Sequence, residues 1–274
     1  MKNMSLEERK ESGLGILAEI LRVCSILDIK FYLAYGTLLG AVRHKGFIPW
    51  DDDIDIWMFR EDYELFLERF NDLSSSRYSV YSTKNISTYP FLMPKVMDNQ
   101  THVREKFYSE LPYLGIWVDL FPIDYLSEKG KENTGKLIKL EHKRWCALYR
   151  QSTIIGKLKL LGYNMIQSDT SFSDFSVNPA DYVNEIHRIH RCTEHHDLVR
   201  SPTSENSFKL FYDSKDFDDV IYTQFETLTL PIPSGYDNLL KKVYGDYMKL
   251  PPTTKRKLSK HIMSSVRKND DRNK

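Results

Sequence analysis

The chain has 274 residues, of which 41% are hydrophobic and 28% are charged, and its net charge is +1. This length allows one large domain with a real hydrophobic core, and the even charge balance gives no sign of a nucleic-acid-binding surface. The three cysteines Cys24, Cys146 and Cys192 have no paired spacing, so we expect reduced thiols and a cytoplasmic protein. We expect neither a signal peptide nor a membrane span, because the most apolar region, residues 13–42, contains several charged side chains.

Apolar periodicity predicts alternating helices and strands along the first 125 residues. Leucines at helical spacing predict an amphipathic helix over residues 6–27. Residues 31–35 predict a short buried strand, which Gly36 interrupts, and a helix resumes over residues 38–43 with Thr37 as its N-cap. Further elements are expected as an acidic strand over 53–58, a helix over 61–70, and strands over 78–82, 91–97, 101–107 and 117–119. We therefore predict a mixed α/β (α+β) core around a short sheet.

Four aspartates within residues 51–55 form the most informative cluster in the chain. Two like charges about 5 Å apart repel by roughly 3 kcal/mol at an effective dielectric near 20, so a bound cation is the usual explanation. In a strand Asp53 and Asp55 share one face, and Asp51 continues it if the chain is already extended there, whereas Asp52 is expected in the entry loop. Carboxylate oxygens suit Mg²⁺ or Mn²⁺ better than Zn²⁺. The cluster therefore predicts a catalytic metal site.

Two other interpretations of this cluster stay open. It is also compatible with a solvated turn. Asp51, Asp53 and Asp55 further match the first three ligands of an EF-hand calcium loop, but Ile56 stands where glycine is expected and Asp62 stands where a bidentate glutamate is expected. A non-catalytic calcium-binding module is therefore an alternative to an enzyme.

The turn at Gly36 and Thr37 offers a place for an anion beside this cluster. Free N–H groups and the dipole at a helix start bind phosphate. Arg43, followed by His44 and Lys45, adds positive charge within two helical turns. A metal site next to an anion site is typical of phosphoryl or nucleotidyl transfer.

The stretch from residue 35 to residue 55 resembles the signature of the LicD phosphocholine transferases, relatives of fukutin and the fukutin-related protein. These proteins belong to the nucleotidyltransferase superfamily, whose pattern is a Gly-Ser/Thr helix start followed by an acidic-x-acidic strand. Gly36 and Thr37 match the helix start, and Asp53 and Asp55 match the strand. The resemblance implies a nucleotidyltransferase-like mixed sheet with flanking helices and a helical insertion.

The superfamily pattern also includes a third acidic residue on a later strand. Asp119 interrupts the apolar run 115–124, and an isolated aspartate in a buried strand is costly unless it is paired or metal-bound. We therefore predict Asp119 as the third carboxylate, whereas Asp124, which follows Pro122, is expected at a turn or a helix cap. Lys95 lies in a predicted strand before a turn and is expected to point toward the same cleft, although a surface lysine is the alternative.

The resemblance implies an enzyme that transfers phosphocholine, or a related phospho-alcohol, from a CDP-activated donor such as CDP-choline and releases CMP. The acceptor would be a sugar hydroxyl of a cell-surface glycan, such as lipopolysaccharide or teichoic acid, or its lipid-linked precursor. Asp53 and Asp55 would hold Mg²⁺, and Asp119 would share a metal and orient or deprotonate the acceptor hydroxyl. The residues expected at the substrate are Gly36, Thr37, Arg43, Lys95 and His261. A nucleotidyltransferase that moves NMP from an NTP to a small acceptor is the alternative.

The resemblance divides the chain into four segments. A catalytic core spans 1–125, a mostly helical region of unknown role spans 126–214, a closing segment similar to that of LicD proteins spans 215–262, and a basic tail spans 263–274. Residues 255–274 carry eight Lys or Arg and two Asp, which predicts a solvated end, with peripheral contact to an anionic membrane as the alternative.

Within the middle region, residues 128–161 are expected to be helical and residues 168–178 to form a loop. A histidine-rich run follows, and we interpret it as a solvated helix. A tetrahedral zinc site is the alternative, with ligands drawn from His187, His190, Cys192 and His195.

Overall fold

The computed structural model describes residues 3–105, 111–150, 177–202, 207–256 and 262–268, and it has the predicted mixed α/β fold. At its centre lies a sheet whose main path follows the order β1-β2-β6-β4-β3. β2 and β6 are parallel, and the other neighbours on this path are antiparallel. These strands are β1 (Tyr32–Leu33), β2 (Asp55–Phe59), β3 (Tyr78–Tyr81), β4 (Lys95–Asp98) and β6 (Trp117–Tyr125). β4 begins four residues later than predicted, directly after Pro94, which has no N–H for a sheet hydrogen bond.

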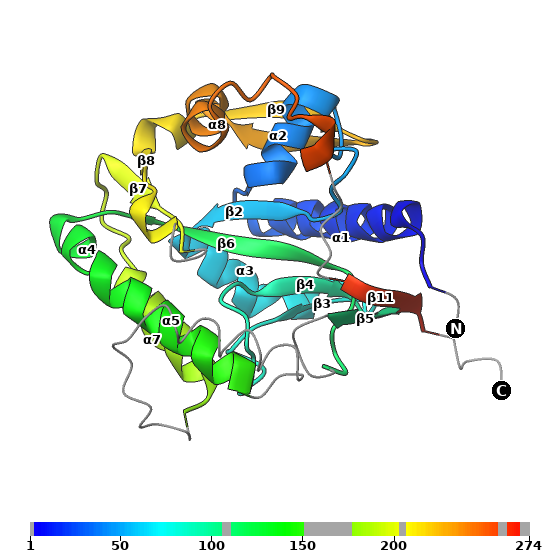
Figure 1. Ribbon diagram of the computed structural model, residues 1–274, viewed down its shortest axis with the longest axis horizontal. Coiled ribbons are helices and arrows are strands. Elements are labelled where there is room, and N and C mark those ends of the chain that lie inside the picture. Colours follow the sequence, from blue (N-terminus) through cyan, green and yellow to red (C-terminus); the bar gives the residue numbers. More distant parts are fainter. Residues whose placement is uncertain (1–2, 106–110, 151–176, 203–206, 257–261, 269–274) are drawn as a thin grey trace.

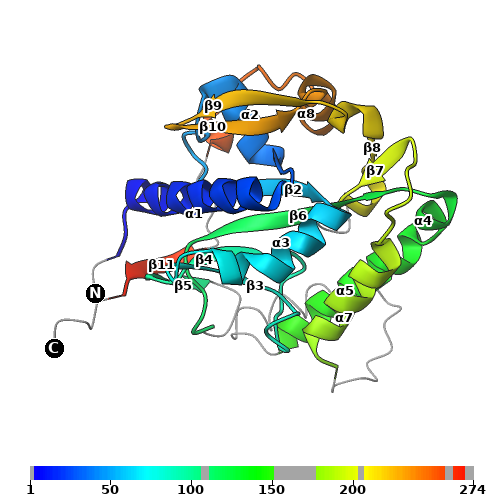
Figure 2. The same ribbon diagram turned by 180° about the vertical axis from the view of Figure 1, so that it is seen from behind.

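Two helices cover one face of this sheet, α1 (Leu6–Leu27) and α3 (Arg60–Leu73) (Figure 2). α1 has the bounds that the sequence predicts, because Ser5 and Glu8 form a capping box at its start. The face of β2 opposite Asp55 packs in the core, since Ile56 and Met58 are fully buried.

A second layer lies on the β1 side of the sheet and is built around α2 (Tyr35–His44) (Figure 1). The strands β9 (Val220–Phe225) and β10 (Leu228–Pro233) form a hairpin that packs on α2 and β1, and α8 (Tyr236–Tyr244) packs on α2. The closing segment predicted over residues 215–262 thus contributes the cover of α2. The predicted start of α2 is wrong by one turn, because the N-cap is Ala34 and Thr37 already lies inside the helix.

The remaining strands lie outside the main path of the central sheet, in a separate two-stranded sheet and in an extension that pairs with β6. β5 (Thr101–Glu105) pairs with β11 (Ile262–Arg267), so the first residues of the predicted basic tail form a strand. β7 (Leu198–Arg200) pairs with the far end of β6 and with β8 (Tyr212–Asp213). The helices of the middle region are α4 (Glu128–Glu132), α5 (Thr134–Arg150) and α7 (Pro179–His190), and the 3₁₀ helices are η1 (Ser207–Lys209), η2 (Ser214–Phe217) and η3 (Thr253–Lys255). No helix within the described ranges combines the length and the apolar character needed to cross a membrane.

Two predictions for the middle of the chain are wrong. Asp124 is not at a turn or a cap, because it lies within β6 and its carboxylate is ion-paired with Arg60. The histidines of α7 are not on a solvated face: His190 is buried against Asp124, and His187 bonds to the Leu92 carbonyl. Since these partners already engage them, the described part of the run does not gather into a zinc site. The predicted helix beyond residue 150 and the predicted loop up to residue 176 lie outside the described residues.

Candidate active site

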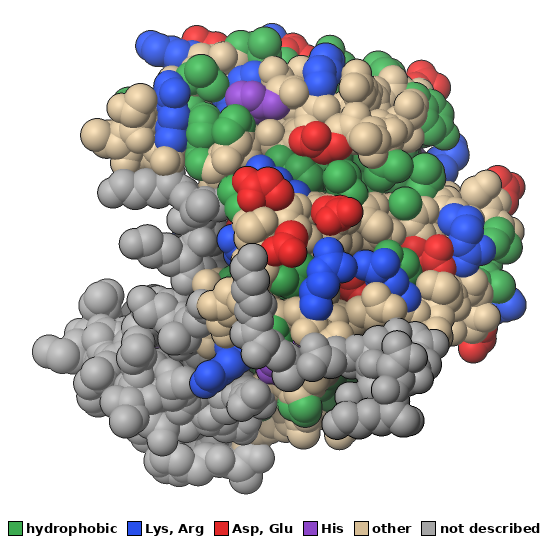
Figure 3. Space-filling view, turned by 90° about the vertical axis from the view of Figure 1, so that its right-hand side faces the viewer, with side chains coloured by type: hydrophobic (Ala, Val, Ile, Leu, Met, Phe, Trp, Pro, Cys, Tyr) green, Lys and Arg blue, Asp and Glu red, His purple; other side chains and the backbone are tan. Residues whose placement is uncertain are grey.

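Two of the predicted carboxylates lie side by side, one at the first residue of β2 and the other at the third residue of β6. Asp55 and Asp119 are register partners on these parallel strands, and Lys95 is the register partner of Asp119 on β4. Register partners on neighbouring strands project to the same face, so Asp55, Asp119 and Lys95 lie on one face of the sheet, near the start of β2 and β6. Figure 3 views the side of the molecule where β2 and β6 begin, and acidic side chains gather in the middle of this face.

The loop before β2 adds further carboxylates. One oxygen each from Asp51, Asp52 and Asp53 lie within 4.8 Å of one another, a spacing that could hold a metal ion. Asp52 lies in the entry loop, as predicted, and is ion-paired with Arg9 at 2.7 Å. A Cβ at Gly36 would lie 3.0 Å from Oδ2 of Asp51, so the missing side chain is what lets this carboxylate approach the start of α2.

Burial and mutual repulsion make these carboxylates hard to ionise. Burial, followed by the charges of Asp51, Asp52 and Asp119, raises the pKa of Asp53 to about 7. The pKa of Asp55 lies well above its usual range for the same reasons, with burial first and the charge of Asp119 next. Lys95 acts in the opposite direction on both groups without cancelling the shift. An arrangement of this kind becomes stable when a cation joins it.

Direct contacts hold the predicted third carboxylate in place. Lys95 Nζ donates to Oδ1 of Asp119 at 2.5 Å, and Trp117 Nε1 donates to Oδ2 at 2.9 Å. Lys95 is buried rather than on the surface, and its ammonium lies over the rings of Trp117 and Phe91. The structure therefore brings Lys95 to the carboxylate cluster, as the sequence predicts.

Thr37 and Arg43 make contacts that the sequence does not reveal. The hydroxyl of Thr37 accepts the backbone N–H of Asp55 at 2.9 Å, so it ties α2 to the acidic strand instead of capping the helix. The guanidinium of Arg43 donates to the Tyr247 carbonyl at 2.6 Å and to the ring of His44. A phosphate-binding role for either residue stays a prediction, and His261 lies outside the described residues.

Comparison with known proteins agrees with this geometry. The domain family described as LicD/FKTN/FKRP, nucleotidyltransferase domain, matches residues 28–165. The chain belongs to this family. The lipopolysaccharide cholinephosphotransferase LicD of Haemophilus influenzae is 30% identical over 268 residues, which is 92% of this chain and 94% of that protein. The human ribitol 5-phosphate transferase FKRP is 40% identical over 43 residues, which is 16% of this chain and 9% of FKRP. This LicD-family protein is accordingly an enzyme of the phosphotransferase class.

A group of aromatic side chains next to the carboxylates of this LicD-family protein was not predicted from its sequence. Trp57 and Phe121 are register partners two residues beyond Asp55 and Asp119, so they continue the same face of the sheet. The ring of Tyr35 packs edge-on against both, at centroid distances of 4.8 Å and 5.2 Å. We call Tyr35, Trp57 and Phe121, together with Tyr212 and Tyr244, the aromatic wall. The alternation of acidic and aromatic residues along both strands is the signal that could have revealed its first members.

The outer members of the aromatic wall are Tyr212 and Tyr244, and Tyr244 lies near the carboxylate cluster. Tyr212 packs on Trp57 at 5.7 Å, and neither the Tyr212 hydroxyl nor Trp57 Nε1 has a hydrogen-bond partner among the described residues. Burial raises the pKa of Tyr244, and the nearby charges of Asp55 and Asp51 add to the shift. Tyr244 is 41% exposed, so part of the wall is open to a ligand.

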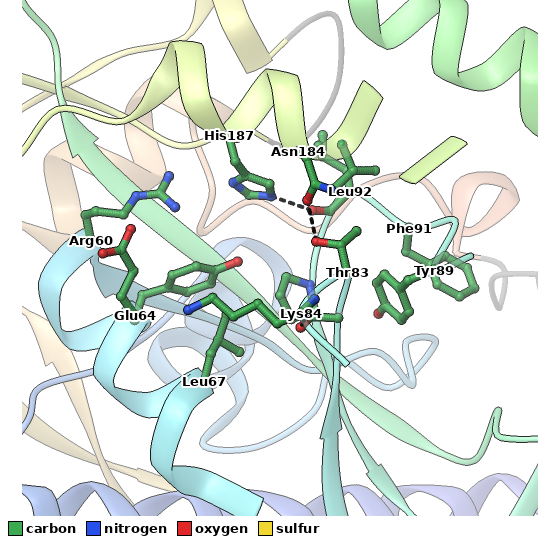
Figure 4. Close-up of a pocket in the computed structure, with 14 residues that line it drawn as sticks. Arg60, Glu64, Leu67, Thr83, Lys84, Tyr89, Phe91, Leu92, Asn184 and His187 are labelled. Carbon is green, nitrogen blue, oxygen red and sulfur yellow. Dashed lines mark hydrogen bonds between the residues drawn. The ribbon is translucent and has the colours of Figure 1, made fainter. Parts of the chain in front are cut away.

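A separate cavity of about 140 Å³ lies between α3, α7 and the loop before β4 (Figure 4). His187 bonds to the Leu92 carbonyl at its edge, and Thr83 bonds to Asn184 across it. None of the predicted site residues lines this cavity. The cavity therefore does not belong to the carboxylate cluster.

Proposed function

We propose that this protein transfers phosphocholine, or a related phospho-alcohol, from a CDP-activated donor to a sugar hydroxyl of a cell-surface glycan or its lipid-linked precursor, with release of CMP. The observation that carries this proposal is the pairing of Asp55 with Asp119 beside the start of α2. This pairing occurs in a chain that is similar over nearly its whole length to a lipopolysaccharide cholinephosphotransferase.

The donor set fits a hard divalent cation. The cluster offers only carboxylate oxygens, and three of them lie within 4.8 Å of one another. Asp53, Asp55 and Asp119, with help from Asp51, would hold Mg²⁺ or Mn²⁺. The cation would supply positive charge that offsets the charge developing on the diphosphate of the donor.

The chain's own residues would position the reacting groups. The backbone N–H groups at Gly36 and Thr37 open α2 and would bind a phosphate of the donor. Lys95 fixes Asp119 and brings positive charge to the same place. The acceptor oxygen would form its bond to phosphorus while the bond between phosphorus and the CMP oxygen breaks.

The aromatic wall supports a donor with a cationic head group. A quaternary ammonium is attracted to the faces of Tyr and Trp rings, and this attraction is worth about 0.5–2 kcal/mol. Trp57 and Phe121 lie two residues from the carboxylate pair, which corresponds to about 7 Å along a strand. Trp57 and Phe121 are buried, so the ammonium of a donor whose phosphate lies at the carboxylates would meet the wall at the exposed ring of Tyr244.

Calorimetric titration with CDP-choline, CDP-ethanolamine, CDP-ribitol, CTP and ATP in the presence of Mg²⁺ tests the proposal. We expect metal-dependent binding of one CDP-alcohol to the native protein, with a loss of about 100-fold or more in Asp55→Ala. CMP should then appear as the product with an acceptor. Binding of an NTP alone, with pyrophosphate as the product, would instead indicate nucleotidyl transfer. Binding of Ca²⁺ without any nucleotide would contradict both enzymatic functions.

A further inference from the structure

The turn that follows α8 carries apolar side chains on the outside of the molecule. Met248 is 57% exposed and Leu250 is 44% exposed, and Pro252 close by is exposed as well. In Figure 1 this part of the chain runs from α8 across the outer side of α2, away from the central sheet. We call residues 245–256 the α8 turn. Exposed apolar residues that are scattered singly are ordinary, but neighbours in one turn form a small apolar surface.

Direct contacts fix the shape of the α8 turn. Tyr247 is buried, and its hydroxyl donates to Oδ1 of Asp237 at 2.8 Å. Arg256 Nε donates to the Pro251 carbonyl at 2.8 Å, which closes the end of the turn. Because Tyr247 is anchored, its neighbour Met248 is held at the surface. The folded backbone therefore presents the apolar side chains of the turn to solvent.

Basic side chains surround these apolar ones. Residues 236–256 contain five Lys or Arg and two Asp, a net charge of +3, whereas the rest of the chain has a net charge of −2. Lys249 stands between Met248 and Leu250 in the sequence, and it is exposed, as is Lys255. Apolar side chains that enter the acyl boundary and basic ones that meet phosphate head groups are what an anionic phospholipid surface binds. The α8 turn is therefore complementary to such a surface in both polarity and charge.

The α8 turn contacts the segments that carry the candidate active site. The guanidinium of Arg256 lies over the ring of Trp50 at 5.3 Å, and Trp50 directly precedes Asp51 of the carboxylate cluster. Arg43 of α2 donates to the Tyr247 carbonyl at 2.6 Å, and α8 packs on α2. A membrane bound at the turn would therefore lie close to the loop before β2.

We propose that the α8 turn docks this enzyme on an anionic phospholipid membrane, with Met248 and Leu250 at the acyl boundary and Lys249 among the lipid phosphates. The inference rests on the proposed function in one respect, since a lipid-linked acceptor would be presented at that surface. The docking surface is distinct from the basic tail, residues 263–274. Two aliphatic side chains and a few charges make such binding weak and reversible.

Flotation of the full chain with lipid vesicles tests the proposal. We expect binding to phosphatidylcholine vesicles that contain about 30% phosphatidylglycerol, weaker binding as salt rises, and much weaker binding to phosphatidylcholine alone. The double variant Met248→Ser and Leu250→Ser should lower the affinity for anionic vesicles roughly 10-fold. Lys249→Gln should lower it about 5-fold. The matched controls are Ile26→Ser, at a 55% exposed position of α1, and Lys129→Gln, at an exposed position of α4, and both should bind like the native protein.

Three outcomes would overturn docking through the α8 turn. One is a native protein that does not bind anionic vesicles. Another is vesicle binding that is equal in the turn variants and in the controls, which would assign the contact to another surface such as the basic tail. The third is a dimer of the native protein in light scattering that the double variant loses, which would show that a second copy covers the turn.

The proposed function is tested separately from the docking surface. Release of CMP from CDP-choline with methyl hexosides as soluble acceptors should be the same in the native protein and in the double variant, because Met248 and Leu250 are not part of the carboxylate cluster. If no CDP-alcohol yields CMP while vesicle binding still depends on the turn, the proposed function fails and the docking surface stands.

Discussion

The two ends of β6 carry one aspartate each, and the protein treats them in opposite ways. Asp124 at the far end accepts both hydrogen bonds of the Arg60 guanidinium, a contact with His190 Nδ1 at 2.6 Å and the backbone N–H of Cys192. Arg200 extends this network by donating to the other ring nitrogen of His190. At the near end, Lys95 is paired with Asp119 and Arg9 with Asp52, whereas Asp51, Asp53 and Asp55 have no ion pair with a described residue.

This difference appears in the pKa values of Asp124 and of Asp53, which lies in the cluster at the near end. Burial alone would raise the pKa of Asp124, but the charges of His190 and Arg60 and their hydrogen bonds hold it well below its usual range. At the other end, burial and neighbouring carboxylates raise the pKa of Asp53 to about 7. The protein's own cations neutralise the far end of β6, which we call the structural end. Under the proposed function a bound metal cation would neutralise the near end, which we call the catalytic end.

The largest effect should follow from removing a charge at the catalytic end. Asp55→Asn should lower turnover roughly 1000-fold, because it removes a ligand of the proposed cation while preserving shape. The free energy of unfolding in the absence of metal should stay the same or rise, since a buried carboxylate among like charges opposes folding. CMP release and urea unfolding measure the two quantities.

Asp72→Asn, at an exposed position of α3, is the matched control and should change neither quantity. A variant Asp55→Asn that is inactive because it has unfolded would remove the contrast between the two ends of β6.

The corresponding Asp→Asn substitution at the structural end of β6 should lower the stability of the protein. Asp124→Asn leaves the buried Arg60 guanidinium without its counter-charge, and the expected loss in the free energy of unfolding is about 3–5 kcal/mol. Because the native pKa of Asp124 is depressed, its contribution is present above the unfolded pKa and is lost as the pH falls through the native value. Urea unfolding at neutral and at acidic pH measures both effects.

A loss of less than about 1 kcal/mol in the free energy of unfolding of Asp124→Asn would contradict this account. So would a difference between the variant and the native protein that does not shrink toward low pH.

Local pattern was enough to predict from sequence which carboxylates gather at the near end of β6. Asp53 and Asp55 alternate with apolar residues, and Asp119 interrupts a buried strand, so each carries its own signal of an unusual environment. The structural end has no local signal, because Asp124 depends on partners 64 and 66 residues away. Tertiary contacts, not residue type, decide the role of this aspartate.

The smallest effect concerns stability in the presence of metal. The raised pKa of Asp53 means that the native protein without metal binds more protons than the unfolded chain between about pH 4 and pH 7. The free energy of unfolding should therefore fall as the pH rises through this window on account of Asp53, and the loss is complete above the window.

Mg²⁺ at about 100 times its Kd should raise the free energy of unfolding by about 2.7 kcal/mol. Its effect on Tm should be larger at about pH 8 than at about pH 5, because cation and protons compete for the same oxygens. Differential scanning calorimetry of the native protein and of Asp53→Asn decides the matter: an equal Mg²⁺ shift at both pH values, or a full shift in the variant, would show that the cation binds elsewhere.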